Sequence, residues 1–181
     1  MVKKQTAVAP FFERVHEKEA ITMLSGEFRH SVDAKNRLFI PAKHRDELCV
    51  SIPEADVSSD EKTADEKSKC FMITKSIREK CLKVYSMAAW EDYISPILKL
   101  ERKDSEKILR SLHKDAAQVS PDSQGRIVLT PVLMQYAQIE KSVVIVGCGT
   151  CAEIWSERLY DEMNAEEDME DIRNTLEAYG L

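Results

Sequence analysis

The stretch HSVDAKNRLFIPAKHRDEL at His30–Leu48 decides the fold, because a second stretch, QVSPDSQGRIVLTPVLMQYA at Gln118–Ala137, repeats its pattern. Each runs from an aspartate through three residues to an arginine, and then through an apolar triplet to a proline that opens a helical pattern. A pattern that recurs within one chain of 181 residues indicates a duplicated structural unit.

The duplication continues downstream, where CLKVYSMAAWEDY at Cys81–Tyr93 matches CAEIWSERLYDEM at Cys151–Met163. The matched positions are Tyr85 with Trp155, Ser86 with Ser156, and Trp90 with Tyr160. From the arginine to the first of these aromatic residues the spacing is 48 positions in the first copy and 29 in the second, a difference of 19. The polar, charged segment 51–69 accounts for the difference, and we expect it to be a solvated loop.

Each copy predicts four short strands and two helices. The expected strands are Glu27–Val32, Leu38–Ile40, Phe71–Thr74 and Leu82–Tyr85, then Ala117–Ser120, Ile127–Leu129, Val143–Val146 and Glu153–Trp155. Thr130 is a natural N-cap before Pro131, and Ser86 and Ser156 are natural caps of the closing helices. Pro96 interrupts the first closing helix, and a new helical segment is expected near Asp104. Strands this short cannot bury a face alone, so we expect an α+β fold in which two repeats close a pseudo-two-fold β-barrel.

The repeated loop is Asp33-Ala34-Lys35-Asn36-Arg37 in the first copy and Asp122-Ser123-Gln124-Gly125-Arg126 in the second. Asparagine and glycine, at equivalent positions, are the residues that tolerate a positive φ, so a tight turn is expected before each arginine. The turn would direct the arginine outward while the aspartate accepts backbone N–H bonds. The aspartate and arginine could simply pair to hold the hairpin. The nearby cations Lys35, Lys43 and Arg45 favour a surface that faces phosphate.

Charge is distributed unevenly along the chain, although its net charge is only −6. Residues 29–45 contain five Lys or Arg and one acid, whereas residues 153–171 contain nine acids and one arginine. The sequence therefore predicts a basic module on an acidic body, and the local field decides which partner docks there.

Other bulk properties limit the class of protein. No apolar run approaches the roughly 18 residues needed to cross a bilayer, and Pro10 and Glu13 interrupt the apolar patch near the N-terminus, which argues against a signal peptide. Five cysteines, an odd number, argue against a secreted disulfide framework. We therefore expect a cytoplasmic protein with reduced thiols.

Several catalytic and metal chemistries are set aside. The CGTC motif at Cys148–Cys151 has no second ligand pair for zinc, and it follows VVIV in an expected hairpin turn rather than opening a helix. We expect Cys81 and Cys151 to serve in packing, and Trp90 and Tyr160 to belong to the core rather than to a base-stacking platform. His30 and His44 are expected at the surface. Neither copy contains a nucleophile, base and orienting group, so an enzyme is not predicted.

The quoted motifs resemble those of a known family. GEFRHSVDAKNRLFIPAKHRDEL looks like the first signature of the MraZ family, and DSQGRIVL, VVIVG and EIWS look like the second. The resemblance covers residues 23–163 apart from the insert. It implies tandem AbrB-like swapped-hairpin repeats, a ring-shaped homo-oligomer, and nucleoid-associated binding to repeated double-stranded DNA elements in the promoter of a division and cell-wall gene cluster. It implies no cofactor, small-molecule substrate or membrane partner.

The family's DNA-contacting motif falls on Asp33 and Arg37, and again on Asp122 and Arg126. Together with Lys35, Lys43 and Arg45 these residues form the predicted DNA-binding set. The second helix has Thr130 where the first has Pro41. The second surface is less basic, because Gln124 matches Lys35 and Met134 matches Arg45. The family usually has glycine before the first arginine, where this chain has Asn36.

These observations give a division of the chain and two functional readings. The resemblance implies that residues 1–22 are an N-terminal extension or an upstream misreading of the start codon, since Met23 lies where family members commonly begin. The predicted units are the first repeat at 23–95 with its insert at 51–69, a helical connection at 96–116, the second repeat at 117–163, and an acidic tail at 164–181. The leading hypothesis is a sequence-specific DNA-binding transcriptional regulator. The alternative is an antitoxin-like interaction module that binds a protein through the insert and acidic helix.

Overall fold

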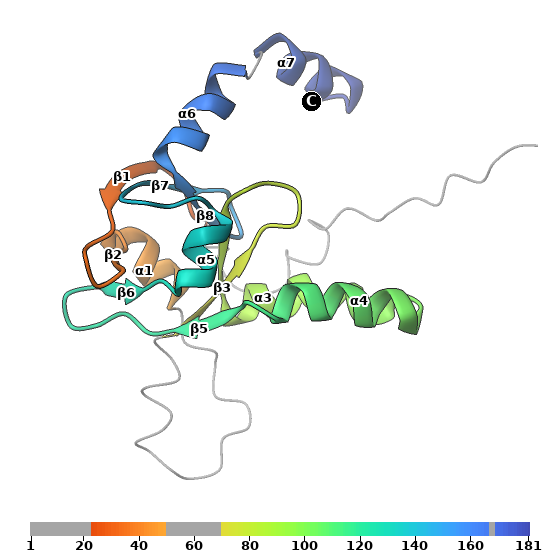
Figure 1. Cartoon of the computed structure of the whole chain (residues 1–181). Helices are drawn as coiled ribbons and strands as arrows, with labels where there is room; N and C mark the ends of the chain where they lie inside the picture. Colours follow the sequence, from red (N-terminus) through yellow and green to blue (C-terminus); the bar gives the residue numbers. More distant parts are fainter. Residues whose placement is uncertain (1–22, 50–69, 167–168) are drawn as a thin grey trace, which may run out of the picture.

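The computed structural model describes residues 23–49, 70–166 and 169–181 (Figure 1). The predictions for the extension 1–22 and the insert 51–69 lie outside these residues. The elements, in chain order, are β1 (Glu27–Ser31), β2 (Arg37–Phe39), α1 (Ala42–Leu48), β3 (Phe71–Lys75), β4 (Leu82–Ser86), α3 (Met87–Ile94), the 3-10 helix η2 (Ile97–Lys99), α4 (Arg102–His113), β5 (Ala117–Val119), β6 (Arg126–Val128), α5 (Pro131–Tyr136), β7 (Ser142–Gly147), β8 (Ala152–Ser156), α6 (Glu157–Glu166) and α7 (Met169–Ala178). Each predicted strand is present, with ends close to those expected.

The strands form an open sheet and a separate ribbon. Among the described residues, six strands pair antiparallel in the order β1-β7-β8-β4-β3-β5, and β2 and β6 form a separate two-stranded sheet. The predicted closed β-barrel is therefore wrong. The two strands that would have to connect the sheet edges are three residues long and pair with each other, so the hydrogen-bonded ladder ends at β1 and β5.

The two repeats exchange strands. β1 of the first repeat pairs with β7 of the second, and β5 of the second pairs with β3 of the first. The equivalent strands β2 and β6 pair with each other, as do β4 and β8. Each repeat thus supplies an edge strand to the hairpin of the other, which agrees with the prediction that each half completes the other.

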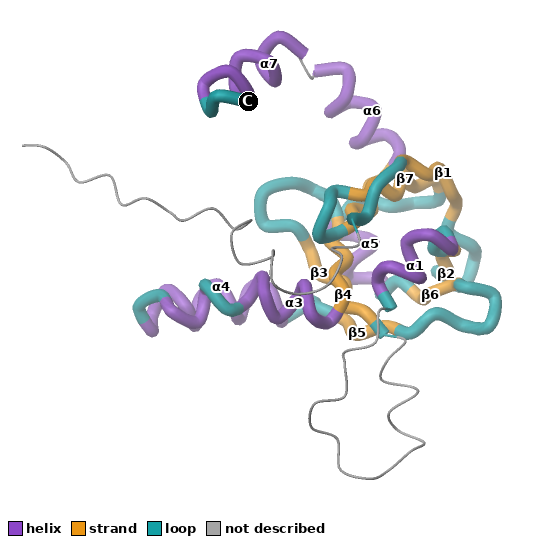
Figure 2. Tube along the Cα trace, turned by 180° about the vertical axis from the view of Figure 1, so that it is seen from behind, coloured by secondary structure: helices purple, strands orange, loops and turns teal. Residues whose placement is uncertain are grey.

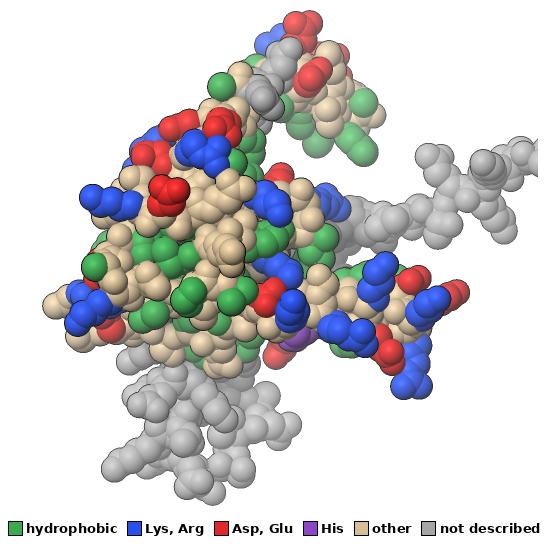
Figure 3. Space-filling view, viewed as in Figure 1, with side chains coloured by type: hydrophobic (Ala, Val, Ile, Leu, Met, Phe, Trp, Pro, Cys, Tyr) green, Lys and Arg blue, Asp and Glu red, His purple; other side chains and the backbone are tan. Residues whose placement is uncertain are grey.

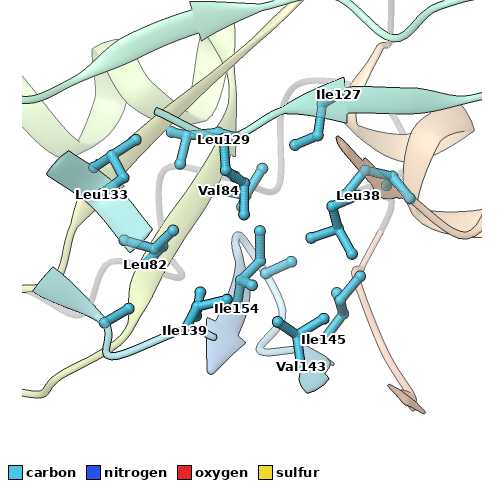
Figure 4. Close-up of a cluster of buried hydrophobic side chains, with 14 of the residues drawn as sticks. Leu38, Leu82, Val84, Ile127, Leu129, Leu133, Ile139, Val143, Ile145 and Ile154 are labelled. Atoms are coloured by element: carbon cyan, nitrogen blue, oxygen red, sulfur yellow. The ribbon is translucent and has the colours of Figure 1, made fainter. Parts of the chain in front are cut away.

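The main core lies between the sheet and the ribbon. Leu38 and Ile127, the inward residues of β2 and β6, are at most 1% exposed and lie among aliphatic side chains of the sheet (Figure 4). Two smaller buried clusters lie beside it, one around Tyr85 and Trp90 and the other around Trp155 and Tyr160. The predicted packing role of Trp90 and Tyr160 is confirmed, since both are buried.

The predicted helix caps are also present. Ser86 Oγ accepts a hydrogen bond from Ala89 N at 3.1 Å, and Thr130 Oγ1 accepts one from Leu133 N at 3.4 Å. Pro131 opens α5. Ser156 Oγ accepts from Leu159 N at 3.4 Å. α4 begins at Arg102, slightly before the predicted start at Asp104.

The helices extend from opposite ends of the sheet. α6 and α7 lie beyond β1 and β7, whereas α3 and α4 extend from the end that carries β3 and β5 (Figures 1 and 2). Among the described residues, none of these helices combines the length and the apolar character that a bilayer crossing requires.

Candidate nucleic-acid interface

The β2–β6 ribbon presents two arginines on one face. Successive residues of a strand point to opposite sides, so burial of Leu38 and Ile127 turns their neighbours outward. Arg37 lies opposite Val128, and Phe39 lies opposite Arg126. The outer face is therefore a small pattern of two arginines on one diagonal and two apolar residues on the other. Phe39 is 38% exposed and Val128 is 57% exposed.

The first loop is held by its aspartate. Asp33 Oδ1 accepts the backbone N–H groups of Lys35 and Arg37 at 2.8 and 2.9 Å, and Oδ2 accepts Arg37 Nε at 2.7 Å. Asn36 has a φ of 57°, as the sequence predicted. The N–H of Arg37 and then its guanidinium hold the pKa of Asp33 below its usual value, so this carboxylate is ionised at neutral pH.

The second loop repeats this geometry bond by bond. Asp122 Oδ1 accepts from Gln124 N and Arg126 N, both at 2.9 Å, and Oδ2 accepts from Arg126 Nε at 2.9 Å. Gly125 has a φ of 76°. The Arg126 guanidinium, followed by the Arg126 N–H, lowers the pKa of Asp122 to about 2. The same local chemistry therefore produces both hairpins.

The two arginines differ in how many of their guanidinium nitrogens bond to the aspartate of the loop. Arg126 Nη2 also donates to Asp122 Oδ2, at 2.8 Å. Among the described residues, Arg37 bonds its aspartate through Nε alone. The aspartate thus fixes the hairpin, and in the first copy it leaves the outer edge of the guanidinium without a hydrogen bond among the described residues. The Arg37 side chain is 32% exposed and the Arg126 side chain 28%.

The other predicted cations are not all gathered around Arg37. Lys35 is exposed in the first loop, whereas Lys43 Nζ donates to Ser25 Oγ at 2.8 Å. Arg45 reaches across to the second repeat. Its guanidinium carbon lies 5.6 Å from the centre of the Phe39 ring, and a Cβ at position 125 would be 2.3 Å from its Nη1. Glycine at 125 therefore serves both the turn and the close approach of Arg45, and the second reason was not predicted.

The prediction that His44 is a surface residue is wrong. His44 is fully buried, with Nε2 3.1 Å from Ser25 O and its ring edge-on to Phe28. It lies one helical turn before the buried Leu48 in α1, a spacing that could have indicated the inner face. His30 is half-buried, its ring 5.4 Å from that of Phe39, and burial lowers its pKa.

Arg29, counted with the basic segment, faces the acidic helix instead. Its Nη1 donates to Glu157 at 2.9 Å and its Nη2 to Asp161 at 2.8 Å, so α6 neutralises it. The positive charge at the ribbon comes from Lys35, Arg37, Arg45 and Arg126. Figure 3 shows basic and hydrophobic side chains together at the end of the molecule that carries β2 and β6.

The cysteines of the duplicated motif and of CGTC adjoin strands of the large sheet. Cys148 and Cys151 flank the turn between β7 and β8, closed by a bond from Cys148 N to Cys151 O at 2.8 Å. Cys81 is fully buried, and burial raises the pKa of its thiol to about 12, which suits packing. Potential ligand atoms of Glu79, Cys81 and Glu153 lie within 4.8 Å of one another, and the Lys83 ammonium already pairs with Glu153 there.

Comparison with known proteins places these features in a family. Two segments, residues 23–111 and 112–178, match the family described as "MraZ protein, putative antitoxin-like". A protein of Clostridium tetani is 34% identical over 162 residues, which cover 88% of this chain and all of the relative. A Thermoanaerobacter protein is 34% identical over 159 residues (86% and 97%), and one of Carboxydothermus hydrogenoformans is 36% identical over 141 residues (77% and 85%). Each relative is named transcriptional regulator MraZ.

The fold and the paired loops define a tandem-repeat α+β protein in which two equivalent Asp–Arg hairpins form one surface. The chain belongs to the MraZ family. The resemblance predicted from the two signatures is confirmed, and the two family matches fall one on each repeat.

Proposed function

We propose that the chain is a DNA-binding transcriptional regulator that contacts duplex DNA through the β2–β6 ribbon and its two loops. The observation that carries this proposal is the placement of Arg37 and Arg126 on one outer face by two loops of matching geometry. The names of the relatives support regulation of transcription. A two-stranded antiparallel ribbon is also a shape that the major groove admits.

Arg37 is the principal contact in this proposal. Its terminal nitrogens suit a phosphate or the O6 and N7 atoms of guanine, which arginine binds through two parallel hydrogen bonds. Lys35 adds a phosphate contact beside it. Arg126 contributes less because one terminal nitrogen is already bonded to Asp122. Asp33 and Asp122 position the arginines rather than contact DNA, and Lys43 and Arg45 add charge at the margin.

Few cations per chain would give weak, salt-sensitive binding, so the proposal includes assembly. Several ribbons in a ring-shaped homo-oligomer would bind repeated promoter elements together, with an effective concentration that multiplies modest contacts. The strand exchange between the repeats supports the AbrB-like swapped-hairpin assignment. The promoter of a division and cell-wall gene cluster is the proposed target.

The α7 helix supports self-assembly. Met169, Ile172, Leu176 and Tyr179 recur at spacings of three and four, and none is buried. The same helix exposes acids, whereas η2 and α4 expose Leu98, Leu100 and several Lys and Arg side chains. Opposite charge and unpartnered apolar groups suit packing of α7 on the η2–α4 surface of a second copy, and such head-to-tail contacts can close a ring.

Replacement of Arg37 by alanine tests the function. Genomic fragments retained by the wild-type protein would be sequenced, and the best fragment used in a gel-shift titration. We expect Arg37→Ala to weaken specific binding by about 100-fold or more, on the order of two lost bonds to charged groups. Arg126→Ala should have a smaller effect.

The matched control is Arg78→Ala, which removes an exposed arginine in the turn between β3 and β4, outside both the ribbon and the η2–α4 surface. It should bind as the wild type does. All variants should keep the same mass by light scattering. Undiminished binding by Arg37→Ala would refute the proposal.

A further inference from the structure

The axis that relates the two repeats passes between Lys83 and Glu153. Lys83 is the second residue after Cys81, and Glu153 is the second after Cys151, so the two positions are equivalent in the duplicated motif. In the β4–β8 ladder they lie directly opposite each other. The ribbon repeats this arrangement, since the equivalent residues Leu38 and Ile127 are also opposite. Each of these residues therefore meets its own counterpart.

The Lys83–Glu153 pair is largely buried, and both carboxylate oxygens of Glu153 accept hydrogen bonds. Its side chains are 24% and 13% exposed, and the Lys83 ammonium donates to Glu153 Oε1. The other carboxylate oxygen of Glu153 accepts Trp155 Nε1 at 2.7 Å. Burial lowers the pKa of Lys83, but the hydrogen bond to Glu153 and the negative groups around it together outweigh burial, so the net pKa is raised and the ammonium is charged at neutral pH.

Pairing of identical repeats would lose this arrangement. Two first repeats would bring one Lys83 against another, and two second repeats would bring one Glu153 against another. Like charges directly opposite on neighbouring strands are unfavourable, and a buried charge without its partner is more so. Leu38 and Ile127 would tolerate either pairing, because both are apolar.

A second ion pair also favours pairing of the first repeat with the second. Lys75 Nζ of β3 pairs with Asp115 just before β5 at 2.8 Å, and both side chains are less than one-fifth exposed. The strand registers make Gly147 the equivalent of Lys75, and the loop spacing makes Gly26 the equivalent of Asp115. There the backbones meet directly, with Gly147 N donating to Gly26 O at 2.9 Å.

The contact between Gly147 and Gly26 has no space for a side chain such as that of Lys75. A Cβ at position 147 would lie 2.3 Å from Ser25 N. Two first repeats would therefore bring Lys75 against the segment that now packs on Gly147. Two second repeats would leave Asp115 without its cation. Charge and shape thus both favour pairing of one first repeat with one second repeat.

We propose that the Lys83–Glu153 pair, supported by the Lys75–Asp115 pair, favours pairing of a first repeat with a second repeat over pairing of two identical repeats. This holds for repeats within one chain and for repeats of two chains. This surface is the repeat-pairing interface, and the partner that fits it is the other repeat. The inference is independent of DNA binding.

Charge reversal tests this selection. Lys83→Glu and Glu153→Lys, each alone, should lower the Tm by at least about 5 °C. The double reversal should recover at least half of that loss. Arg158→Glu and Glu162→Arg provide the matched control, because this ion pair lies on the exposed face of one helix, α6. Their Tm shifts should stay within about 2 °C. A double reversal that melts no higher than the weaker single variant would overturn the proposal.

Mixing the two single variants tests the choice of partner directly. Equal amounts of the Lys83→Glu and Glu153→Lys chains would be unfolded in urea and refolded together. The carboxylate introduced in one chain can then pair with the ammonium introduced in the other. We expect the mixture to melt above either variant refolded alone and then mixed. Identical melting curves for the two preparations would overturn the proposal.

The Glu153→Lys variant also loses the acceptor of the Trp155 N–H, so a milder cycle guards against a variant that does not fold. Lys83→Met and Glu153→Gln remove the charges, and the amide keeps an acceptor for Trp155. The double variant should lose less stability than the two single losses added together. Additive losses would overturn the proposal.

Discussion

At the scale of single residues, Asp33 and Asp122 organise the candidate interface. Each carboxylate accepts two backbone N–H groups of its own loop and the Nε of its arginine. A carboxylate has enough lone pairs for all three bonds, which fix both the turn and the direction of the guanidinium. The edge of Arg37 that faces away from Asp33 is thereby held ready before any ligand arrives, which reduces the entropy lost on binding.

This arrangement predicts a dependence on acid. The pKa of Asp122 is about 2 in the folded chain, below its ordinary value of 3.8. A group whose pKa is lower in the folded state stabilises that state above the ordinary value and loses this contribution as the pH falls through the folded pKa. We expect the order of the second loop to be lost between about pH 4 and about pH 2, as reported by the Gln124 and Arg126 amide signals in NMR spectra.

Other carboxylates titrate in the same range, so the comparison is with Asp122→Asn. The asparagine variant should show a less ordered loop at about pH 5 and little further change in these two signals down to about pH 2. If its signals follow the wild-type titration, the carboxylate of Asp122 is not the group that orders the loop.

At the scale of elements, short strands are joined to helices by serine and threonine caps. Ser86 ends β4 and caps α3, whose residues Trp90 and Ile94 fill the second core cluster. An N-cap serine satisfies one of the backbone donors that the first helical turn leaves unpaired. The same residue therefore ends one element and begins the next.

Removal of this cap should be measurable. We expect Ser86→Ala to lower the free energy of unfolding by about 1 kcal/mol, because the Ala89 N–H loses its acceptor. Urea unfolding at neutral pH would measure the change. Ser111→Ala is the matched control, since Ser111 is exposed inside α4 and alanine favours a helix. Equal effects of the two substitutions would contradict the capping role.

The elements that sequence predicted well are those fixed by nearby residues. The turns at Asn36 and Gly125, the cap at Thr130 and the eight strands all depend on residues within a few positions of one another. The closed barrel failed because it depends on which strands meet at the sheet edges. Three-residue strands give no local signal of that choice.

In the candidate site, too, features set by nearby residues were predictable and contacts between distant residues were not. The Asp–Arg loops were predictable, since each is a local hydrogen-bonded unit. The position of Arg45 against Gly125 joins residues 80 positions apart, and the contact of Arg29 with Asp161 joins residues 132 positions apart. Patterns of neighbouring residues do not predict contacts between residues so far apart in the sequence. Only the count of charges was available, and it assigned Arg29 to the wrong neighbours.

At the scale of the whole molecule, the β2–β6 ribbon and the α7 helix differ in what they expose. The ribbon carries two arginines and the exposed apolar residues Phe39 and Val128, whereas α7 carries acids beside an apolar stripe. Leu176 in α7 is 45% exposed, and Tyr179, which directly follows the helix, is 80% exposed, although residues of these types are usually covered when they recur at helical spacing. Assembly through α7 would cover them and would leave the ribbons available for DNA.

Leu176→Glu tests assembly through this stripe. We expect the variant to form smaller particles than the wild type at micromolar concentration, because a charge on the stripe cannot be buried against a second copy without a large desolvation cost. Light scattering coupled to gel filtration would measure the mass, and the Tm at low concentration should change little because Leu176 is not buried within its own chain. Asn174→Glu adds the same charge on the opposite face of α7 and should assemble like the wild type. A wild-type chain that is monomeric at this concentration, or a Leu176→Glu chain with undiminished mass, would contradict assembly through α7.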